Sequence, residues 1–111
     1  MARAYVPEAG DVVWLEFSPQ AGHEQAGHRP AVVLSPASYN RKTGMMICCP
    51  MTKQIKGYPF EVIIGKNPPS AILSDQVKSL DWRARHAKRG GSVPGDVLAE
   101  IRGKLGALIG I

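Results

Sequence analysis

Residues 12–17 read VVWLEF, and this stretch decides the class of fold. It lies between a Gly-Asp pair and a Ser-Pro pair, residue types that commonly bound strands. β-branched and aromatic residues favour extended backbone, and alternation along a strand places Val13, Leu15 and Phe17 on one face. We therefore expect a strand, and with it a sheet, near the start of the chain.

Further short segments follow, because 12 Gly and 9 Pro divide most of the chain into short pieces. Residues 31–34 (AVVL) and 45–49 (MMICC) are unbroken apolar runs, typical of strands buried on both faces. Residues 60–64 (FEVII) form another candidate strand, and residues 71–80 form a less regular one. Together these segments predict about five antiparallel strands.

The last segment has a helical period instead. Apolar residues recur there every three or four positions, at Val97, Ile101, Leu105 and Leu108. Pro94 suits the first turn of a helix, so we expect an amphipathic C-terminal helix that starts near it. The chain is thus expected to be mainly β, a small, strongly bent sheet or partly open barrel with one C-terminal helix.

Length and composition narrow the class of protein. The chain has 111 residues, of which 44% are hydrophobic and 21% charged, so we expect a single domain over residues 1–111. Its 14 Lys and Arg against 9 Asp and Glu give a formal charge of +5, which favours an acidic or phosphate-bearing partner. We see no apolar run near the ~20 residues that span a bilayer, no signal peptide and no zinc-ligand spacing. Cys48 and Cys49 are adjacent and poorly placed to pair, so we expect a reduced, cytoplasmic protein without membrane segment, metal or cofactor.

The basic residues fall into two clusters that together hold 10 of the 14. The first occupies the interval between Glu24 and Glu61, which has no acidic residue. The second surrounds His86, and Trp82 within it is expected to be able to stack on a base. The members of the two clusters are Arg29, Arg41, Lys42, Lys53 and Lys56, and then Lys78, Arg83, Arg85, Lys88 and Arg89. Solvated loop charges are the alternative, but the clustering favours nucleic acid.

The segment 20–30 (QAGHEQAGHRP) carries the most chemistry. It holds His23, Glu24, His28 and Arg29, and it is too long for a tight hairpin. Metal ligation by the two histidines and the glutamate is one interpretation, weakened by their irregular spacing. Metal-free cleavage of RNA fits better, because the 2′-hydroxyl of RNA supplies the nucleophile and the enzyme supplies a base, an acid and a cation. Glu24 or a histidine can be the base, Arg29 can hold the phosphate, and Thr52 can donate to an oxygen.

Five stretches carry a family signature, in order along nearly the whole chain: GDVVW (10–14), QAGHRPAVVLS (25–35), PMT (50–52), GYPFEV (57–62) and DQVKS (75–79). The chain resembles the MazF/PemK/Kid family, the toxins of bacterial toxin–antitoxin pairs, and it is most similar to the MazF branch. The resemblance implies an SH3-like barrel and a homodimer. It also implies a sequence-specific, metal-independent endoribonuclease that cleaves single-stranded mRNA and so inhibits translation and growth. The products would be a 2′,3′-cyclic phosphate, or a 3′-phosphate, and a 5′-hydroxyl.

The resemblance also assigns residues. It implies that Arg29 and Thr52 are the main catalytic groups, with Glu24 and His28 as further ones. We expect Arg29 to act chiefly as an electrostatic clamp, since its pKa lies too high for a proton donor, and Glu24 and His28 to share the proton transfer. Asp75 matches a base of the Kid branch, which leaves the identity of the base open. The residues expected to contact RNA are His23, Lys53, Lys56, Asp75, Gln76, Lys78, Arg83 and Arg85.

The same resemblance implies a partner, an antitoxin of the MazE type with an acidic, extended tail that would occupy the basic groove. Two alternatives stay open. One is a gyrase-poisoning toxin of the CcdB type, which shares the fold without the cleavage chemistry. The other is an SH3-like module that binds RNA without cleaving it.

Overall fold

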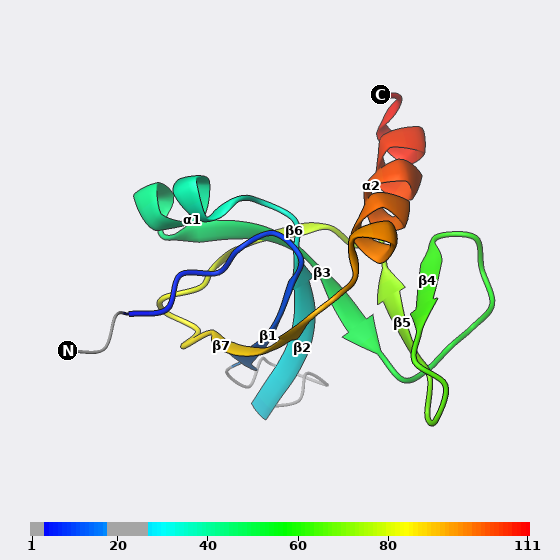
Figure 1. The fold of residues 1–111 in the computed structure, drawn as a ribbon, viewed down its shortest axis with the longest axis horizontal. Helices are drawn as coiled ribbons and strands as arrows, with labels where there is room; N and C mark the ends of the chain where they lie inside the picture. The colour runs from blue at the N-terminus through cyan, green and yellow to red at the C-terminus, as the bar shows by residue number, and fades with distance from the viewer. Residues whose placement is uncertain (1–3, 18–26) are drawn as a thin grey trace.

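The computed structural model describes residues 4–17 and 27–111, and this part of the chain forms seven strands and two helices (Figure 1). In chain order they are β1 (Asp11–Phe17), β2 (Gly27–Val33), α1 (Ala37–Thr43), β3 (Met45–Thr52), β4 (Glu61–Ile64), β5 (Ser70–Leu73), β6 (Lys78–Asp81), β7 (Lys88–Ser92) and α2 (Gly95–Ile109). All strand pairs are antiparallel, in the order β4-β5-β3-β2-β1-β7, and β6 pairs with β3 off this path. The predicted mainly β fold with a C-terminal helix is confirmed.

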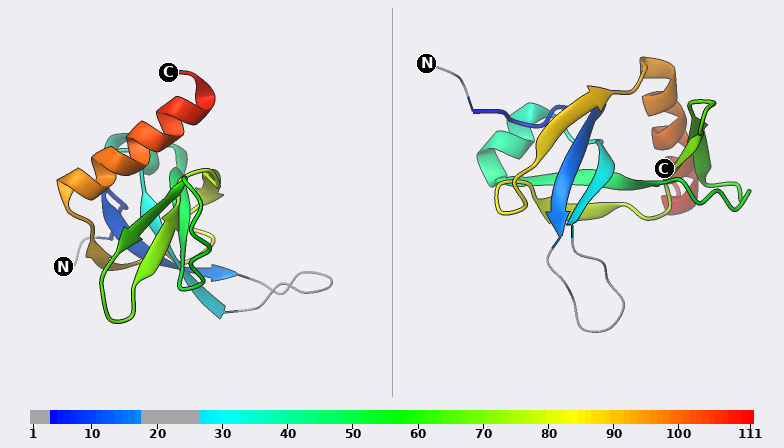
Figure 2. Two further views of the ribbon diagram at one scale, coloured as in Figure 1. Left: turned by 90° about the vertical axis from the view of Figure 1, so that its right-hand side faces the viewer. Right: turned by 90° about the horizontal axis from the view of Figure 1, so that it is seen from below.

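Strand β3 curls the sheet because it belongs to both of its halves. Its first part pairs with β2 on one side and β6 on the other, with Cys48 opposite both Val33 and Lys78. Its last residues pair with β5, where Thr52 lies opposite Ala71. The views in Figure 2 show the result, a curled half-barrel with α2 lying across it.

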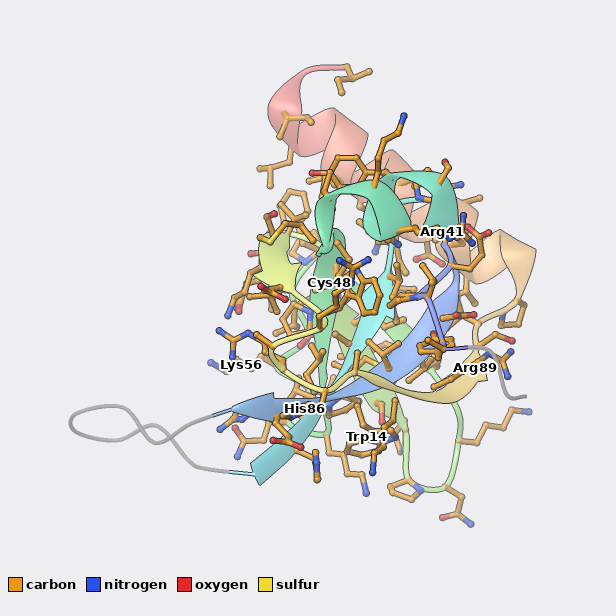
Figure 3. All side chains as sticks on the ribbon, turned by 90° about the vertical axis from the view of Figure 1, so that its left-hand side faces the viewer. Trp14, Arg41, Cys48, Lys56, His86 and Arg89 are labelled. Atoms are coloured by element: carbon orange, nitrogen blue, oxygen red, sulfur yellow. The ribbon has the colours of Figure 1, made fainter. Side chains whose placement is uncertain are left out.

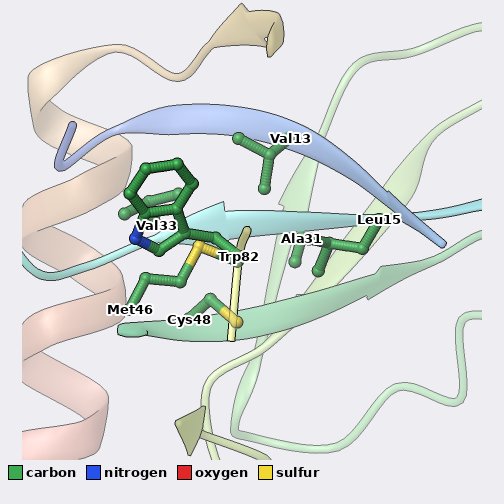
Figure 4. Close-up of a cluster of buried hydrophobic side chains, with 7 residues drawn as sticks. All are labelled: Val13, Leu15, Ala31, Val33, Met46, Cys48 and Trp82. Carbon is green, nitrogen blue, oxygen red and sulfur yellow. The ribbon is translucent and has the colours of Figure 1, made fainter. Parts of the chain in front are cut away.

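Two apolar clusters pack on the two faces of β2 and β3, as their unbroken apolar runs predict. On one face Val33, Met46 and Cys48 meet residues of β1 and the indole of Trp82 (Figure 4). We call this the inner face. On the other face Val32 and Cys49 pack against β4, β5 and the fully buried Ile101 of α2. Burial of each such side chain contributes roughly 1.5–3 kcal/mol.

Three elements differ from the expectation. The segment 71–80 is two strands, β5 and β6, because the chain turns after Leu73, where Gln76 N–H donates to the Leu73 carbonyl at 3.1 Å. Helix α1 and strand β7 were not predicted, since neither has an apolar period. The strand 45–49 was expected to be buried on both faces, but Ile47 is 37% exposed. It lines an open groove beside the end of α2.

Trp82 was expected to be able to stack on a base, and its position rules this out. Its side chain is 7% exposed and packs in the inner cluster, so it presents no face to a base. Its Nε1 donates to the carbonyl of Asn40 at 2.9 Å, which ties the segment after β6 to α1. Trp82 is a core residue, and its place within a basic cluster was misleading.

Candidate functional site

Arg29 and Thr52 lie near the same end of the ladder between β2 and β3. Arg29 lies opposite Leu15 of β1 and shares the inner face with Ala31. The β2–β3 ladder ends at the pair Ala31 and Pro50, so Arg29 and Thr52 each lie two residues beyond its last pair, at the same end. The Arg29 side chain is exposed and Thr52 is half-buried at the end of its strand, where its Oγ1 accepts the Gln54 N–H at 3.1 Å. Both residues therefore lie at one open end of the half-barrel, which we call the mouth.

Two further cations border the mouth. Lys78 is exposed and lies directly opposite Cys48 on the β3–β6 ladder. Arg85 follows β6, and its Nη1 donates to the Glu16 carbonyl at 3.4 Å. Burial raises the pKa of the Cys48 thiol to about 11, and the charges of Lys78 and Arg85 oppose that rise. Both cations thus lie within electrostatic reach of the inner face.

The segment 53–60 continues the site beyond Thr52 and is held by Glu61. One carboxylate oxygen of Glu61 accepts the Lys56 N–H at 2.9 Å, and the other accepts the Gly57 N–H at 2.7 Å. These bonds, that from Lys56 first, hold the pKa of the Glu61 carboxyl below its usual value. Lys104 of α2 donates to the carbonyls of Pro59 at 2.7 Å and Glu61 at 3.0 Å, which fastens the same segment from the helix.

A small polar pocket lies between this segment and the turn after β5. It has a volume of about 160 Å³ and is lined by Thr52, Gln54, Lys56, Tyr58, Glu61, Leu73 and Gln76. The Tyr58 hydroxyl donates to Asp75 Oδ1 at 2.9 Å, and partial desolvation together with this bond raises the pKa of Tyr58. Gln76 and Lys56 therefore line the same pocket as Thr52, and Asp75 bonds to a third lining residue, Tyr58. Sequence reasoning missed the roles of Glu61 and Tyr58, although both lie in the GYPFEV stretch.

His28 lies apart from Arg29, although the two are neighbours in sequence. Alternation along β2 turns His28 to the outer face, opposite the inner one, where it is the cross-strand partner of Glu16. Its Nε2 lies 3.8 Å from one carboxylate oxygen of Glu16, and His86 Nδ1 lies 3.0 Å from the other. The pKa of Glu16 is lowered, first by the hydrogen bond from His86.

The other predicted residues divide into three groups. Lys53 is exposed directly after Thr52, so it belongs with the mouth. Arg83 does not: its guanidinium lies over the Trp82 ring at 4.8 Å and donates to the Arg41 carbonyl at 2.8 Å, near the start of β3. Arg41 belongs to α1, and Figure 3 shows it apart from His86. His23 and Glu24 lie outside the described residues.

Over residues 4–17 and 27–111, no group of three or more His, Cys, Asp or Glu has the arrangement of a metal site. In the same part of the chain, neither helix has the length and apolar character needed to cross a membrane. Fold and site together define a class: a small half-barrel protein whose mouth presents guanidinium, ammonium and hydroxyl groups suited to a phosphate diester.

Comparison with known proteins identifies the family within this class. Residues 8–109 match the family described as the PemK-like, MazF-like toxin of type II toxin–antitoxin systems, and the chain belongs to that family. It is 54% identical to the endoribonuclease toxin MazF of Escherichia coli K12, over 99% of this chain and 100% of that protein. It is 30% identical to the endoribonuclease PemK of Escherichia coli, over 92% of this chain and 81% of that protein. A MazE–MazF crystal structure from Deinococcus radiodurans superposes with a TM-score of 0.90 at 56% identity, covering 97% of this chain and 99% of the matched chain. The resemblance noted in the sequence is confirmed.

Proposed function

We propose that this toxin is an endoribonuclease that cleaves single-stranded mRNA at the mouth by attack of the RNA's own 2′-hydroxyl, without a metal ion. The 2′ oxygen forms a bond to the adjacent phosphorus, and the bond from phosphorus to the 5′ oxygen breaks. The products are a 2′,3′-cyclic phosphate and a 5′-hydroxyl. One proton leaves the 2′-hydroxyl to a base, and one proton reaches the leaving 5′ oxygen.

The observation that supports this proposal is that Arg29 and Thr52 lie just beyond the same end of the β2–β3 ladder. A guanidinium and a hydroxyl there can donate to the non-bridging oxygens, on which negative charge grows during the reaction. Glu24 is the proposed proton carrier. His28, the other group that the resemblance implies, faces away from Arg29 on β2 and is left out of the proton transfer. Since Tyr58 already donates to Asp75, the latter is assigned to RNA contact rather than to the base.

The proposed path of the RNA strand follows the cations and amides of the mouth. It runs over Lys53, Lys56, Gln76, Lys78 and Arg85, and His23 is a further proposed contact. Arg83 is left out of this path, because its contacts to Arg41 and Trp82 place it near the start of β3.

The partners follow from the relatives. The Deinococcus radiodurans toxins were solved with MazE, and we propose an antitoxin of that kind with an acidic tail that competes with RNA for the mouth. We further propose a homodimer that acts in the cytoplasm, each subunit being one domain. Exposed apolar side chains on β3 and α2, at Ile47, Leu108, Ile109 and Ile111, are the proposed dimer surface.

The test is cleavage of defined single-stranded RNAs by the purified toxin in EDTA, with the new ends identified by mass spectrometry. Arg29→Ala is expected to lower kcat by about 10²–10³-fold while RNA binding changes only a few-fold, because the lost donors act on the transition state. Thr52→Val is expected to lower kcat in the same direction. Arg41→Ala, which removes an exposed arginine of α1, is the matched control and keeps wild-type rates.

Other outcomes would contradict the proposal in distinct ways. Equal losses of binding and cleavage in Arg29→Ala would make Arg29 a binding residue. RNA bound but left intact across varied sequences would favour the non-catalytic module. Trapped DNA–gyrase complexes together with intact RNA would favour the CcdB-type toxin.

A further inference from the structure

The carboxylate of Glu16 joins two segments on the outer face, and neither it nor His86 has a role in the proposed mechanism. One of its oxygens lies 3.0 Å from Nδ1 of His86, and the other lies 3.8 Å from Nε2 of His28. Glu16 and His28 belong to paired strands, whereas His86 lies in the segment 82–87 that connects β6 to β7. The pair of Glu16 and His86, which we call the latch, therefore ties this connection to β1.

The backbone of His86 adopts a left-handed conformation, which most non-glycine residues avoid. Its φ is +50°, and it is the one non-glycine residue with a positive φ in the described parts of the chain. Glycine, or asparagine, adopts this region at lower cost than histidine. Such a position points to what the side chain contacts, and that contact is the Glu16 carboxylate.

The latch lies directly beside a residue of the mouth. Arg85 precedes His86 in sequence, and its backbone carbonyl accepts the Glu16 N–H at 2.9 Å. The His86 imidazole meets Glu16 on the outer face, whereas the charge of Arg85 reaches Cys48 on the inner face. Loss of the His86 contact would thus remove this side-chain tie of the connection to the Glu16 carboxylate, and would leave the bonds between Arg85 and the Glu16 backbone to hold it against β1.

We propose that Glu16 and His86 are positioning residues, and that the latch steadies the connection from which Arg85 reaches the mouth, where its guanidinium meets a phosphate of the RNA strand. This proposal rests on the proposed ribonuclease function and names further residues that serve it. Neither latch residue needs to touch the reacting atoms.

Two substitutions of His86 separate the contact from the backbone. Both His86→Gly and His86→Asn suit the positive φ, but the Asn amide keeps an N–H donor near the place of Nδ1. His86→Gly is expected to raise KM for a cleaved single-stranded RNA about three- to five-fold with kcat within two-fold, the range for loss of one exposed ion pair. His86→Asn is expected to remain close to wild type. Glu16→Gln is expected to raise KM as His86→Gly does, whereas the control Asp96→Asn, which removes an exposed carboxylate of α2, leaves it unchanged.

Hydrogen exchange of the Glu16 amide gives a readout without RNA. This N–H donates to the Arg85 carbonyl, so its exchange is expected to quicken in His86→Gly and to stay slow in His86→Asn. A fall in kcat at unchanged KM would overturn the proposal, as would identical behaviour of the Gly and Asn variants. If the wild-type toxin cleaves no RNA, the proposed function fails, and unchanged exchange in His86→Gly would then overturn the latch by itself.

Discussion

Replacement of Asn40 by alanine should weaken the fold by an amount that its hydrogen bonds allow us to work out. The side chain is fully buried in α1. Its Nδ2 donates to the carbonyls of Pro7 at 2.8 Å and Ser35 at 3.0 Å, and its Oδ1 accepts the Ser35 hydroxyl at 2.6 Å. The same hydroxyl accepts the Ile47 N–H at 2.8 Å, so the network joins the N-terminal segment, α1 and β3.

The three side-chain bonds of Asn40 each contribute about 1 kcal/mol net. Asn40→Ala removes all three and leaves the Pro7 carbonyl with a lost donor, at a further cost of about 1–2 kcal/mol. We therefore expect the free energy of unfolding to fall by about 4–5 kcal/mol, a large share of the stability of a domain of this size.

Urea denaturation followed by Trp82 fluorescence measures this change, because the Trp82 indole bonds to the backbone carbonyl of residue 40, which the substitution keeps. Ser38→Ala, at an exposed position of the same helix, is the control and should change stability by less than about 0.5 kcal/mol. A loss below about 1 kcal/mol in Asn40→Ala would refute the reasoning, since the network would then contribute little.

Three further results are expected. Because Glu61 has a lowered pKa, it stabilises the fold above the pKa it has when unfolded, and this contribution is lost as the pH falls through its lower folded pKa. The free energy of unfolding should therefore fall less steeply with decreasing pH, below pH 4.5, for Glu61→Gln than for wild type. An equal pH dependence in the two proteins would contradict this role. Burial raises the pKa of the Cys48 thiol to about 11 and that of the Cys49 thiol to about 12. Both thiols should therefore resist alkylation at about pH 8 until urea unfolds the protein. Fast labelling of the folded protein would contradict this, because it would show that the thiols are accessible. A Cβ on Gly90 would lie 2.5 Å from the Trp14 ring, so Gly90→Ala should displace that exposed indole and increase its quenching by iodide, with Trp82 unaffected; unchanged quenching would mean that the ring already lies elsewhere.

Local patterns were sufficient for much of the fold. The strands expected at 12–17, 31–34, 45–49 and 60–64, and the helix near Pro94, all form within a few residues of the predicted limits. Each has its own apolar period or its own glycine and proline boundaries. Strand β7 has neither, because it reads KRGGS and is defined by backbone pairing with β1, which no local pattern encodes.

The site shows the same limit. Motifs singled out Arg29 and Thr52, but their place at the same end of the β2–β3 ladder depends on backbone pairing that no local pattern encodes. Trp82 was misread because its burial depends on side chains of β1, β2 and β3, which lie far from it in the sequence. The outward direction of His28 could have been found from alternation if the strand had been extended back beyond Ala31.

The sharing of β3 between the two halves of the sheet has a consequence for cooperativity. Adjacent residues of this strand, Cys48 and Cys49, belong to different apolar clusters. Because both clusters need β3 in place, β3 cannot leave one of them without disrupting the other. The half that carries Arg29 and the half that carries the pocket beside Thr52 therefore unfold as one unit rather than as separate foldons. Local opening is left to the segments outside β3, which include residues 53–60 and 82–87, so the part of the mouth that β3 itself forms keeps its shape for as long as the domain is folded.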